Sequence, residues 1–172
     1  MKLAEALNIR ADLKKKILQL KERLLRNSKV QEGEEPSENP ENLLLELNSN
    51  LSELEILIKK INRTNCKTFY GDKTITDLIA ERDVLALNLS VKREFLKEAS
   101  EKIDRYSNTE VKILSTVNIS EKQKEIDKLS KILRETDMKI QELNWITELE
   151  KKKKRYLSEW MLSLVKGMKL FL

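Results

Sequence analysis

The sequence predicts an all-α fold of long helices that pack as a bundle or an antiparallel coiled coil. Charged residues make up 37% of the 172 residues, while the helix-interrupting types are scarce, with three Gly and two Pro. Apolar residues recur at steps of three and four, which is the period of one helix face. Aromatic residues make up only 5%, so the core should be built from Leu and Ile. This composition excludes a Gly-rich β-barrel, a disulfide scaffold and a doubly wound nucleotide-binding fold.

The first helix is expected over residues 2–28. Four apolar residues follow one another at steps of four, three and four, which is the pattern of a coiled-coil seam. Four further leucines widen the apolar face of this helix, as in a helical bundle. The seam and the four leucines are Leu13, Ile17, Leu20 and Leu24, with Leu3, Leu7, Leu18 and Leu25. Residues 29–41 contain five Glu together with Gly33, Pro36 and Pro40. They are expected to form an acidic, solvated linker.

The second helix is expected to begin near Asn39, because Asn suits the N-cap and Pro40 suits the first turn. It ends in a polar cluster at residues 62–65. Between these points lies the most regular heptad pattern of the chain: Leu44, Leu47, Leu51, Leu54, Ile58 and Ile61.

A small β-hairpin or tight turn is expected over residues 67–75, around Gly71. The third helix is expected over residues 76–106, with Thr74 and Asp77 in a capping-box spacing. A short extended connector near residues 108–117 should lead to the fourth helix, which begins at Asn118 or at Ser120. The two helices should pair as an antiparallel hairpin. Their seams are Leu78, Arg82, Leu85, Leu89, Lys92, Leu96, Ala99 and Ile103, and Ile119, Ile126, Leu129, Leu133, Ile140 and Leu143.

Several kinds of chemistry are excluded by residues that the chain lacks. There is no histidine, which removes Ser-His-Asp and Cys-His catalysis and His-ligated zinc. Cys66 is the single cysteine, so neither an intramolecular disulfide nor a Cys-only zinc site can form. The glycines are too far apart for a phosphate-binding loop. We therefore expect no metal and no cofactor.

Residues 150–172 form a separate segment in this interpretation, after a helical domain at residues 1–149. Residues 151–172 hold seven basic residues against one acid, whereas the preceding part is almost neutral. Apolar residues follow the basic block at helical spacing, which predicts a basic amphipathic helix. It either packs on the bundle or a second subunit, or it contacts an anionic membrane or a protein partner. The contact candidates are Lys151, Lys152, Lys153, Lys154, Arg155 and Trp160. The helical domain at residues 1–149 has almost no net charge, which argues against a nucleic-acid partner.

A second candidate site lies where polar residues follow the second helix and interrupt the third. Arg82 lies in the apolar seam of the third helix, where a charge destabilises the fold unless it is paired. One interpretation is therefore an ion pair that fixes the register of the helices. Asn and Thr near a helix end can likewise satisfy free backbone groups. The alternative is a ligand-binding or enzymatic corner formed by Asn62, Arg63, Asn65, Arg82 and Asp83.

The expected location is the cytoplasm. No apolar run approaches the length of a membrane-spanning helix, and the first residues mix acids and bases without a signal-peptide core.

Several blocks of sequence resemble a bacterial family of small helical proteins of unknown function. Some of its members carry the name septicolysin, after a cytolysin. The resemblance extends over residues 1–149, and the name implies membrane activity as one expectation. Its blocks are MKLAEAL (1–7), RADL (10–13), ERLLRNSKVQEGEEP (22–36), INRTN (61–65), LIAERDVL (78–85) and IQELNWITEL (140–149).

The leading hypothesis for function is a non-enzymatic, self-associating helical scaffold or interaction protein that forms a homo-oligomer. It depends on the long apolar seams, which offer more surface than one thin hairpin can bury. One alternative is a septicolysin-like, membrane-active protein that uses the basic segment. The other alternative is the ligand-binding or enzymatic corner described above.

Overall fold

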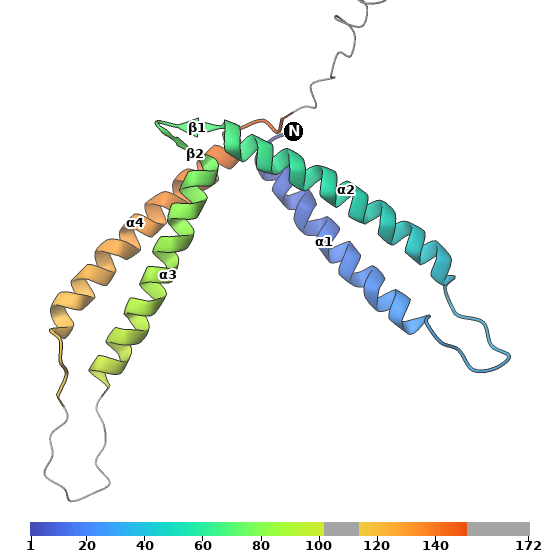
Figure 1. Cartoon of the computed structure of the whole chain (residues 1–172), viewed down its shortest axis with the longest axis horizontal. Coiled ribbons are helices and arrows are strands. Elements are labelled where there is room, and N and C mark those ends of the chain that lie inside the picture. Colours follow the sequence, from blue (N-terminus) through green and yellow to red (C-terminus); the bar gives the residue numbers. More distant parts are fainter. Residues whose placement is uncertain (102–113, 151–172) are drawn as a thin grey trace, which may run out of the picture.

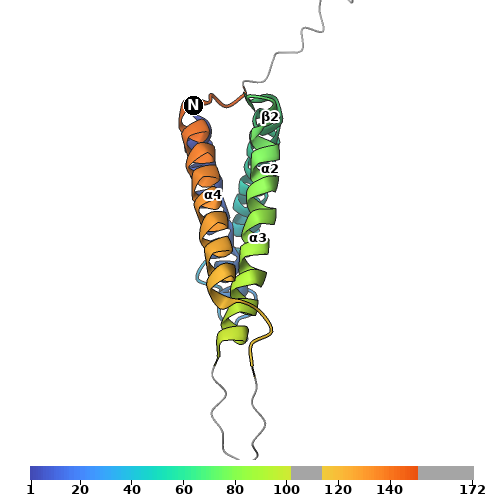
Figure 2. The same cartoon turned by 90° about the vertical axis from the view of Figure 1, so that its left-hand side faces the viewer.

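The computed structural model describes residues 1–101 and 114–150, and it confirms an all-α fold with one small hairpin. Two antiparallel helical hairpins diverge from a shared end like the two arms of a V (Figure 1). Seen from the side, each arm is a single layer of two helices (Figure 2). We call the shared end the apex. The elements are α1 (Leu3–Arg26), α2 (Pro40–Lys67), β1 (Phe69–Tyr70), β2 (Lys73–Thr74), α3 (Ile75–Ser100) and α4 (Ile119–Ile146).

The starts of two helices follow the capping residues that the sequence predicted. The Asn39 side chain accepts hydrogen bonds from the backbone N–H groups of Glu41 (2.8 Å) and Asn42 (3.3 Å), with Pro40 in the first turn. Thr74 and Asp77 form a complete capping box at the start of α3. Both satisfy backbone donors that a helix leaves free at its N-terminus.

Of the two starts predicted for the fourth helix, Asn118 is correct and Ser120 is wrong. Asn118 is the N-cap, and its side chain accepts a hydrogen bond from the backbone of Glu121 at 3.2 Å. Ser120 therefore lies inside the first turn. Helix α3 also ends earlier than predicted, at Ser100, where Glu101 adopts extended backbone. An acid is unfavourable at a helix C-terminus, where the helix dipole is negative.

The predicted β-hairpin forms between α2 and α3. Phe69 pairs with Thr74 and Tyr70 with Lys73. Gly71 occupies the turn with a φ of 64°, which glycine adopts without strain. In the connector predicted near residues 108–117, residues 114–117 form no strand, and residues 108–113 lie outside the described residues.

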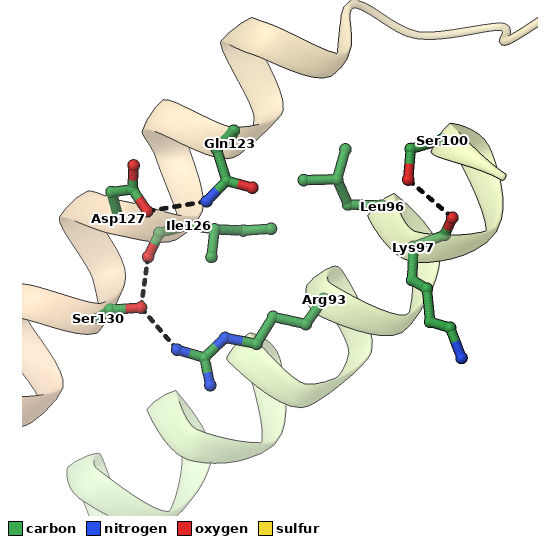
Figure 3. A pocket seen from close by; sticks show the side chains of 8 residues that line it. All are labelled: Arg93, Leu96, Lys97, Ser100, Gln123, Ile126, Asp127 and Ser130. Carbon is green, nitrogen blue, oxygen red and sulfur yellow. Dashed lines mark hydrogen bonds between the residues drawn. The ribbon is translucent and has the colours of Figure 1, made fainter.

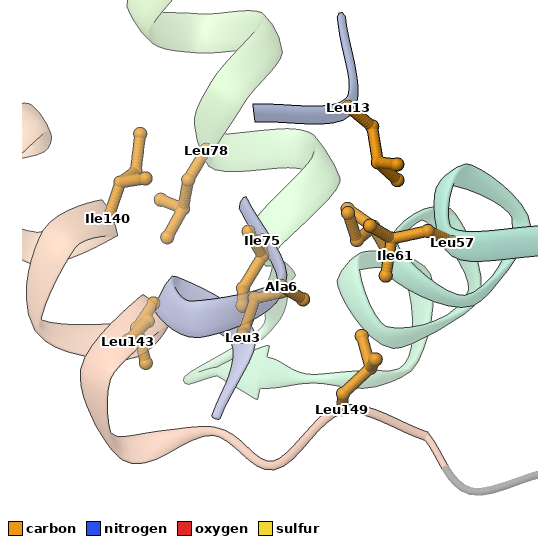
Figure 4. Packing of buried hydrophobic residues seen from close by; sticks show 10 residues of the cluster. All are labelled: Leu3, Ala6, Leu13, Leu57, Ile61, Ile75, Leu78, Ile140, Leu143 and Leu149. Carbon is orange, nitrogen blue, oxygen red and sulfur yellow. The ribbon is translucent and has the colours of Figure 1, made fainter. Parts of the chain in front are cut away.

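The main hydrophobic core lies at the apex and joins the two arms. It takes buried residues from all four helices and from the segment after α4 (Figure 4). The two ends of the described fold also meet here, because Leu3 N–H donates to the Thr147 carbonyl (2.9 Å) and Leu149 N–H to the Met1 carbonyl (3.0 Å). The buried members are Leu3, Ala6, Leu13, Leu57, Ile61, Ile75, Leu78, Ile140, Leu143 and Leu149.

Each arm buries only the seam between its two helices. In the α3–α4 arm the described part of the predicted seam is correct, with Leu89, Leu96 and Ile126 forming a second buried cluster. Ile103 lies outside the described residues. In α1 the predicted seam is also correct. The wider face expected for α1 forms only near the apex, where Leu3 is buried and Leu7 packs against the core. Farther along the arm it does not form, because a two-helix arm buries one stripe per helix. Four of the leucines assigned to seam or stripe are exposed: Leu18, Leu25, Leu44 and Leu51.

The loop between α1 and α2 is held by a buried amide rather than by apolar contacts. Asn27 is buried, and its Nδ2 donates to the Arg23 carbonyl (2.9 Å). Its Oδ1 accepts from Ser37 Oγ (2.9 Å) and from the Glu38 backbone (3.0 Å). Arg23 also forms an ion pair with Glu38, which lowers the pKa of that carboxyl.

Candidate functional site

The polar residues at the end of α2 that belong to the candidate corner differ in their exposure to solvent. Asn62 and Arg63 are exposed, whereas Asn65 is half-buried. The Asn65 Oδ1 atom is buried and has no hydrogen-bond partner within the described part of the chain. The ligand-binding interpretation of this corner stays a prediction.

The other two residues of the proposed corner, Arg82 and Asp83, lie in α3, and Arg82 contacts α4. Nε of Arg82 lies 2.7 Å from Oδ1 of Asp83, an ion pair without hydrogen-bond alignment. Its Nη1 lies 3.6 Å from Oδ1 of Asp137 in α4. The Arg82 side chain is 34% exposed. These contacts fit the register-fixing interpretation.

The buried member of the corner is Thr64, which the prediction did not single out as a site residue. Its Oγ1 donates to the Lys60 carbonyl (2.9 Å) and accepts from the Glu150 backbone N–H (3.0 Å). The hydroxyl thereby anchors the segment that follows α4. A Thr at helical spacing from Leu57 and Ile61 was the available signal in the sequence.

A shallow groove runs between α3 and α4 near the open end of that arm (Figure 3). Its volume is about 380 Å³, and the buried Leu96 and Ile126 form its floor. Arg93 reaches across it to Ser130 Oγ at 2.9 Å, and the Gln123 amide donates to Asp127 at 2.8 Å. The remaining lining residues are Lys97 and Ser100.

A second groove of about 290 Å³ lies beside it, around a three-residue charge cluster. Glu125 in α4 pairs with Lys92 of α3 and, at 3.3 Å, with Lys122. Hydrogen bonds from these two ammonium groups lower the pKa of the Glu125 carboxyl. Phe95 forms the apolar part of the lining.

Neither groove holds the parts of a hydrolytic or metal site. Arg93, Lys92 and Lys122 each contact a neighbouring side chain. Across residues 1–101 and 114–150, no group of three potential metal ligands occurs. No helix in those ranges is long and apolar enough to cross a membrane. The basic contact candidates at residues 151–155 and 160 lie outside the described residues.

The most distinctive surface is a second apolar stripe on α3, outside the buried seam. Its members follow one another at steps of three, four and four, so they share one helix face. Their exposed fractions are 69% for Val84, 66% for Leu87, 58% for Val91 and 49% for Phe95. We call these four residues the α3 stripe. Apolar residues on two faces of one helix normally indicate two packing partners.

Residues 10–149 match a protein family described as a family of unknown function, DUF6847. Among solved structures, the chain is similar to a functionally unknown conserved protein from Corynebacterium diphtheriae, with 37% sequence identity and a TM-score of 0.81. That match covers 87% of this chain and 99% of the other. No curated protein matches the chain significantly. The chain therefore belongs to the DUF6847 family, whose function is unknown.

Proposed function

We propose that this chain is a self-associating helical interaction protein, in which a second copy covers the exposed apolar faces of the arms. The observation that carries the proposal is the α3 stripe. Twenty large apolar residues are exposed in the described part of the fold, against sixteen buried apolar residues. Scattered exposed leucines are common in monomers, but a continuous apolar helix face favours a protein–protein interface.

A second copy is the favoured partner because each chain carries an apolar surface on both arms. Leu18 and Leu25 are one heptad apart on α1, as are Leu44 and Leu51 on α2. With the α3 stripe, these make eight exposed apolar residues. They lie on three helices of both arms, so each copy of the chain offers several apolar faces to another copy.

Light scattering on a sizing column tests this proposal with the full chain. The wild-type protein is expected to elute at a defined multiple of its 20.2 kDa mass. Val91→Glu places a charge in the centre of the α3 stripe and is expected to yield the 20.2 kDa monomer, because an unpaired charge is costly to bury in an interface.

The matched control is Ser90→Glu, which adds the same side chain at the adjacent exposed position on another helix face. This variant should keep the wild-type mass. A wild-type protein that stays monomeric at micromolar concentration would contradict the proposal. So would a Val91→Glu variant that associates like the wild type.

Membrane lysis, which the septicolysin resemblance predicts, is a separate candidate function. The exposed aromatic residues near the apex, Phe69, Tyr70 and Trp145, favour contact with lipid. Dye release from anionic vesicles tests lysis directly. Release that depends on the concentration of the full chain would support it, and intact vesicles at saturating protein would rule it out.

A further inference from the structure

Helix α1 exposes a face on which lysines alternate with leucines. Lys14, Leu18, Lys21 and Leu25 follow one another at steps of four, three and four, so they share one side of the helix. Leu18 is 62% exposed and Leu25 is 64% exposed, and both lysines are exposed as well. Within the described part of the chain, neither lysine has an ion-pair partner. We call these four residues the α1 face.

The α3 stripe is accompanied by the opposite charge. Glu94 lies seven positions after Leu87, and Glu98 lies seven positions after Val91. Residues one heptad apart share a helix face, so both carboxylates lie along the stripe. Both are exposed, and neither forms an ion pair among the described residues. Ser90 Oγ donates to Glu94 at 3.4 Å, which leaves the charge of that carboxylate uncompensated.

The cations of α3 do not compensate these carboxylates. Arg82, Lys92 and Arg93 each contact a side chain of α4. Lys97 lines the groove between α3 and α4. The exposed stripe of α3 therefore carries negative charge at its edge, whereas the exposed leucines of α1 are accompanied by positive charge.

The exposed leucines of α2 do not offer this complementary charge. Glu41 lies three positions before Leu44, and Glu55 lies four positions after Leu51. Lys59 pairs with Glu55, but Glu41 has no ion-pair partner in the described ranges. Packing this side of α2 on an α3 stripe, or one α3 stripe on another, would bring like charges together, which disfavours both arrangements.

We propose that the α1 face of one copy of this chain packs on the α3 stripe of a second copy. The inference rests on the self-association proposed above, and it names the surface that covers the stripe. The leucines of the α1 face cover apolar side chains of the stripe, while its lysines lie beside Glu94 and Glu98. Helices α1 and α3 belong to arms that diverge (Figure 1), so this contact forms between chains.

Charge reversal on each side of the contact tests this inference in the full chain. One double variant is Glu94→Lys with Glu98→Lys, and the other is Lys14→Glu with Lys21→Glu. Each variant by itself sets like charges against each other, so its dissociation constant for self-association should rise about tenfold or more, because two exposed ion pairs become two repulsions. Sedimentation equilibrium over a dilution series measures this constant. All four positions are exposed, so the fold should be retained, which circular dichroism checks.

An equimolar mixture of the two double variants should recover the lost affinity. In this mixture the positive α3 stripe of one variant meets the negative α1 face of the other, and their unchanged faces are also of opposite charge. The mixture should therefore form a complex of the wild-type mass. High salt should narrow the difference between each variant and the wild type, because ions screen charges at an exposed contact.

The matched control is Lys16→Glu with Lys128→Glu, which changes the net charge as much as the α1 variant does. Both lysines are exposed and lie outside the α1 face and the α3 stripe, so the dissociation constant should stay close to the wild-type value. Wild-type affinity in either double variant, or a mixture that recovers no affinity, would overturn the pairing of α1 with α3 but not self-association itself. A monomeric wild-type protein would contradict both.

Discussion

At the scale of single residues, two buried polar side chains hold segments that would otherwise be free loops. Thr64 joins the last turns of α2 to the segment after α4, and Asn27 holds the loop between α1 and α2. Both side chains are buried, and their polar atoms form hydrogen bonds with backbone or side-chain groups. Buried polar groups of this kind are costly to leave unpaired, so they define the position of the segments they bind.

Thr64→Val should lower the free energy of unfolding by about 1–3 kcal/mol. The substitution keeps the shape of the side chain but leaves the Glu150 N–H without its acceptor. Urea unfolding followed by circular dichroism measures the change. Asn62→Ala, at an exposed position two residues earlier, is the control and should stay close to the wild type. Equal stability of both variants would contradict the anchoring role.

The polar corner illustrates which residue roles could be read from the sequence. The residue types predicted caps and an ion pair, and Asn39, Thr74 and Arg82 fulfil these roles. The sequence could not assign Thr64 to Glu150, because the partner is a backbone group 86 positions away. It also could not predict that Arg63 is exposed while Thr64 is buried, since burial depends on how the two arms pack together at the apex.

At the scale of elements, the arms are held by seams that match the predicted three–four periodicity. Helix α1 and the α3–α4 pair bury the expected residues, because each seam has a single partner helix. In α2 the predicted seam is only partly correct. Leu43 and Leu57, which lie outside the predicted seam, are buried, whereas Leu44 and Leu51 are exposed. Periodicity alone cannot choose between adjacent stripes.

Thr74→Ala should lower the stability of the protein by about 1 kcal/mol, because it removes the side-chain cap of α3. The Thr74 hydroxyl accepts from the Asp77 backbone at 3.2 Å and contacts the Asp77 carboxylate at 2.6 Å. Thermal and urea unfolding measure this loss. Thr76→Ala, at an exposed site inside the first turn, provides the comparison and should have the smaller effect.

The α3–α4 pairing should weaken in acid through Glu125. Its pKa is lowered below the ordinary value of 4.5 by Lys92 and Lys122. A group with a depressed folded pKa contributes its stability above the unfolded pKa and loses it as the pH falls through the folded pKa. The contribution of Glu125 to the stability of the protein should therefore be constant above about pH 4.5 and decline below it.

Glu125→Gln removes this titration and should flatten the acid decline. Urea midpoints at neutral pH and at about pH 3 measure the difference between the wild type and the variant. Because Glu38 and Glu55 also have lowered pKa values, the variant should still lose some stability in acid. An acid decline of wild-type size in the variant would show that Glu125 has no part in it.

At the scale of the whole molecule, buried apolar packing is concentrated at the apex. The apical core joins all four helices, whereas the second cluster contains only three buried residues. The sequence predicted the four helices, the β-hairpin and the pairing of α3 with α4, but not the angle between the two arms. Similar Leu and Ile seams fit several arrangements of four helices, and only tertiary contacts such as those of Leu3 and Leu149 select one.

Ile75→Ala should lower the free energy of unfolding by about 2–5 kcal/mol, because it leaves a cavity at a fully buried position. Hydrogen exchange should show lost protection at the apex of both arms, since this core connects them. Met138→Ala, at an exposed position on α4 outside the α3 stripe, should change stability by less than about 0.5 kcal/mol. Loss of protection confined to the α3–α4 arm would contradict a shared core.

In the proposed assembly, a second copy covers the α3 stripe of each chain. Electron spin dipolar coupling measures this contact in the full chain labelled only at Asn88→Cys, an exposed position near the α3 stripe. Cys66→Ser removes the exposed native thiol. We expect a dipolar signal between chains that disappears when labelled protein is diluted with an excess of unlabelled protein. Fully labelled, concentrated protein without any dipolar signal would show that the chains do not meet at the α3 stripe.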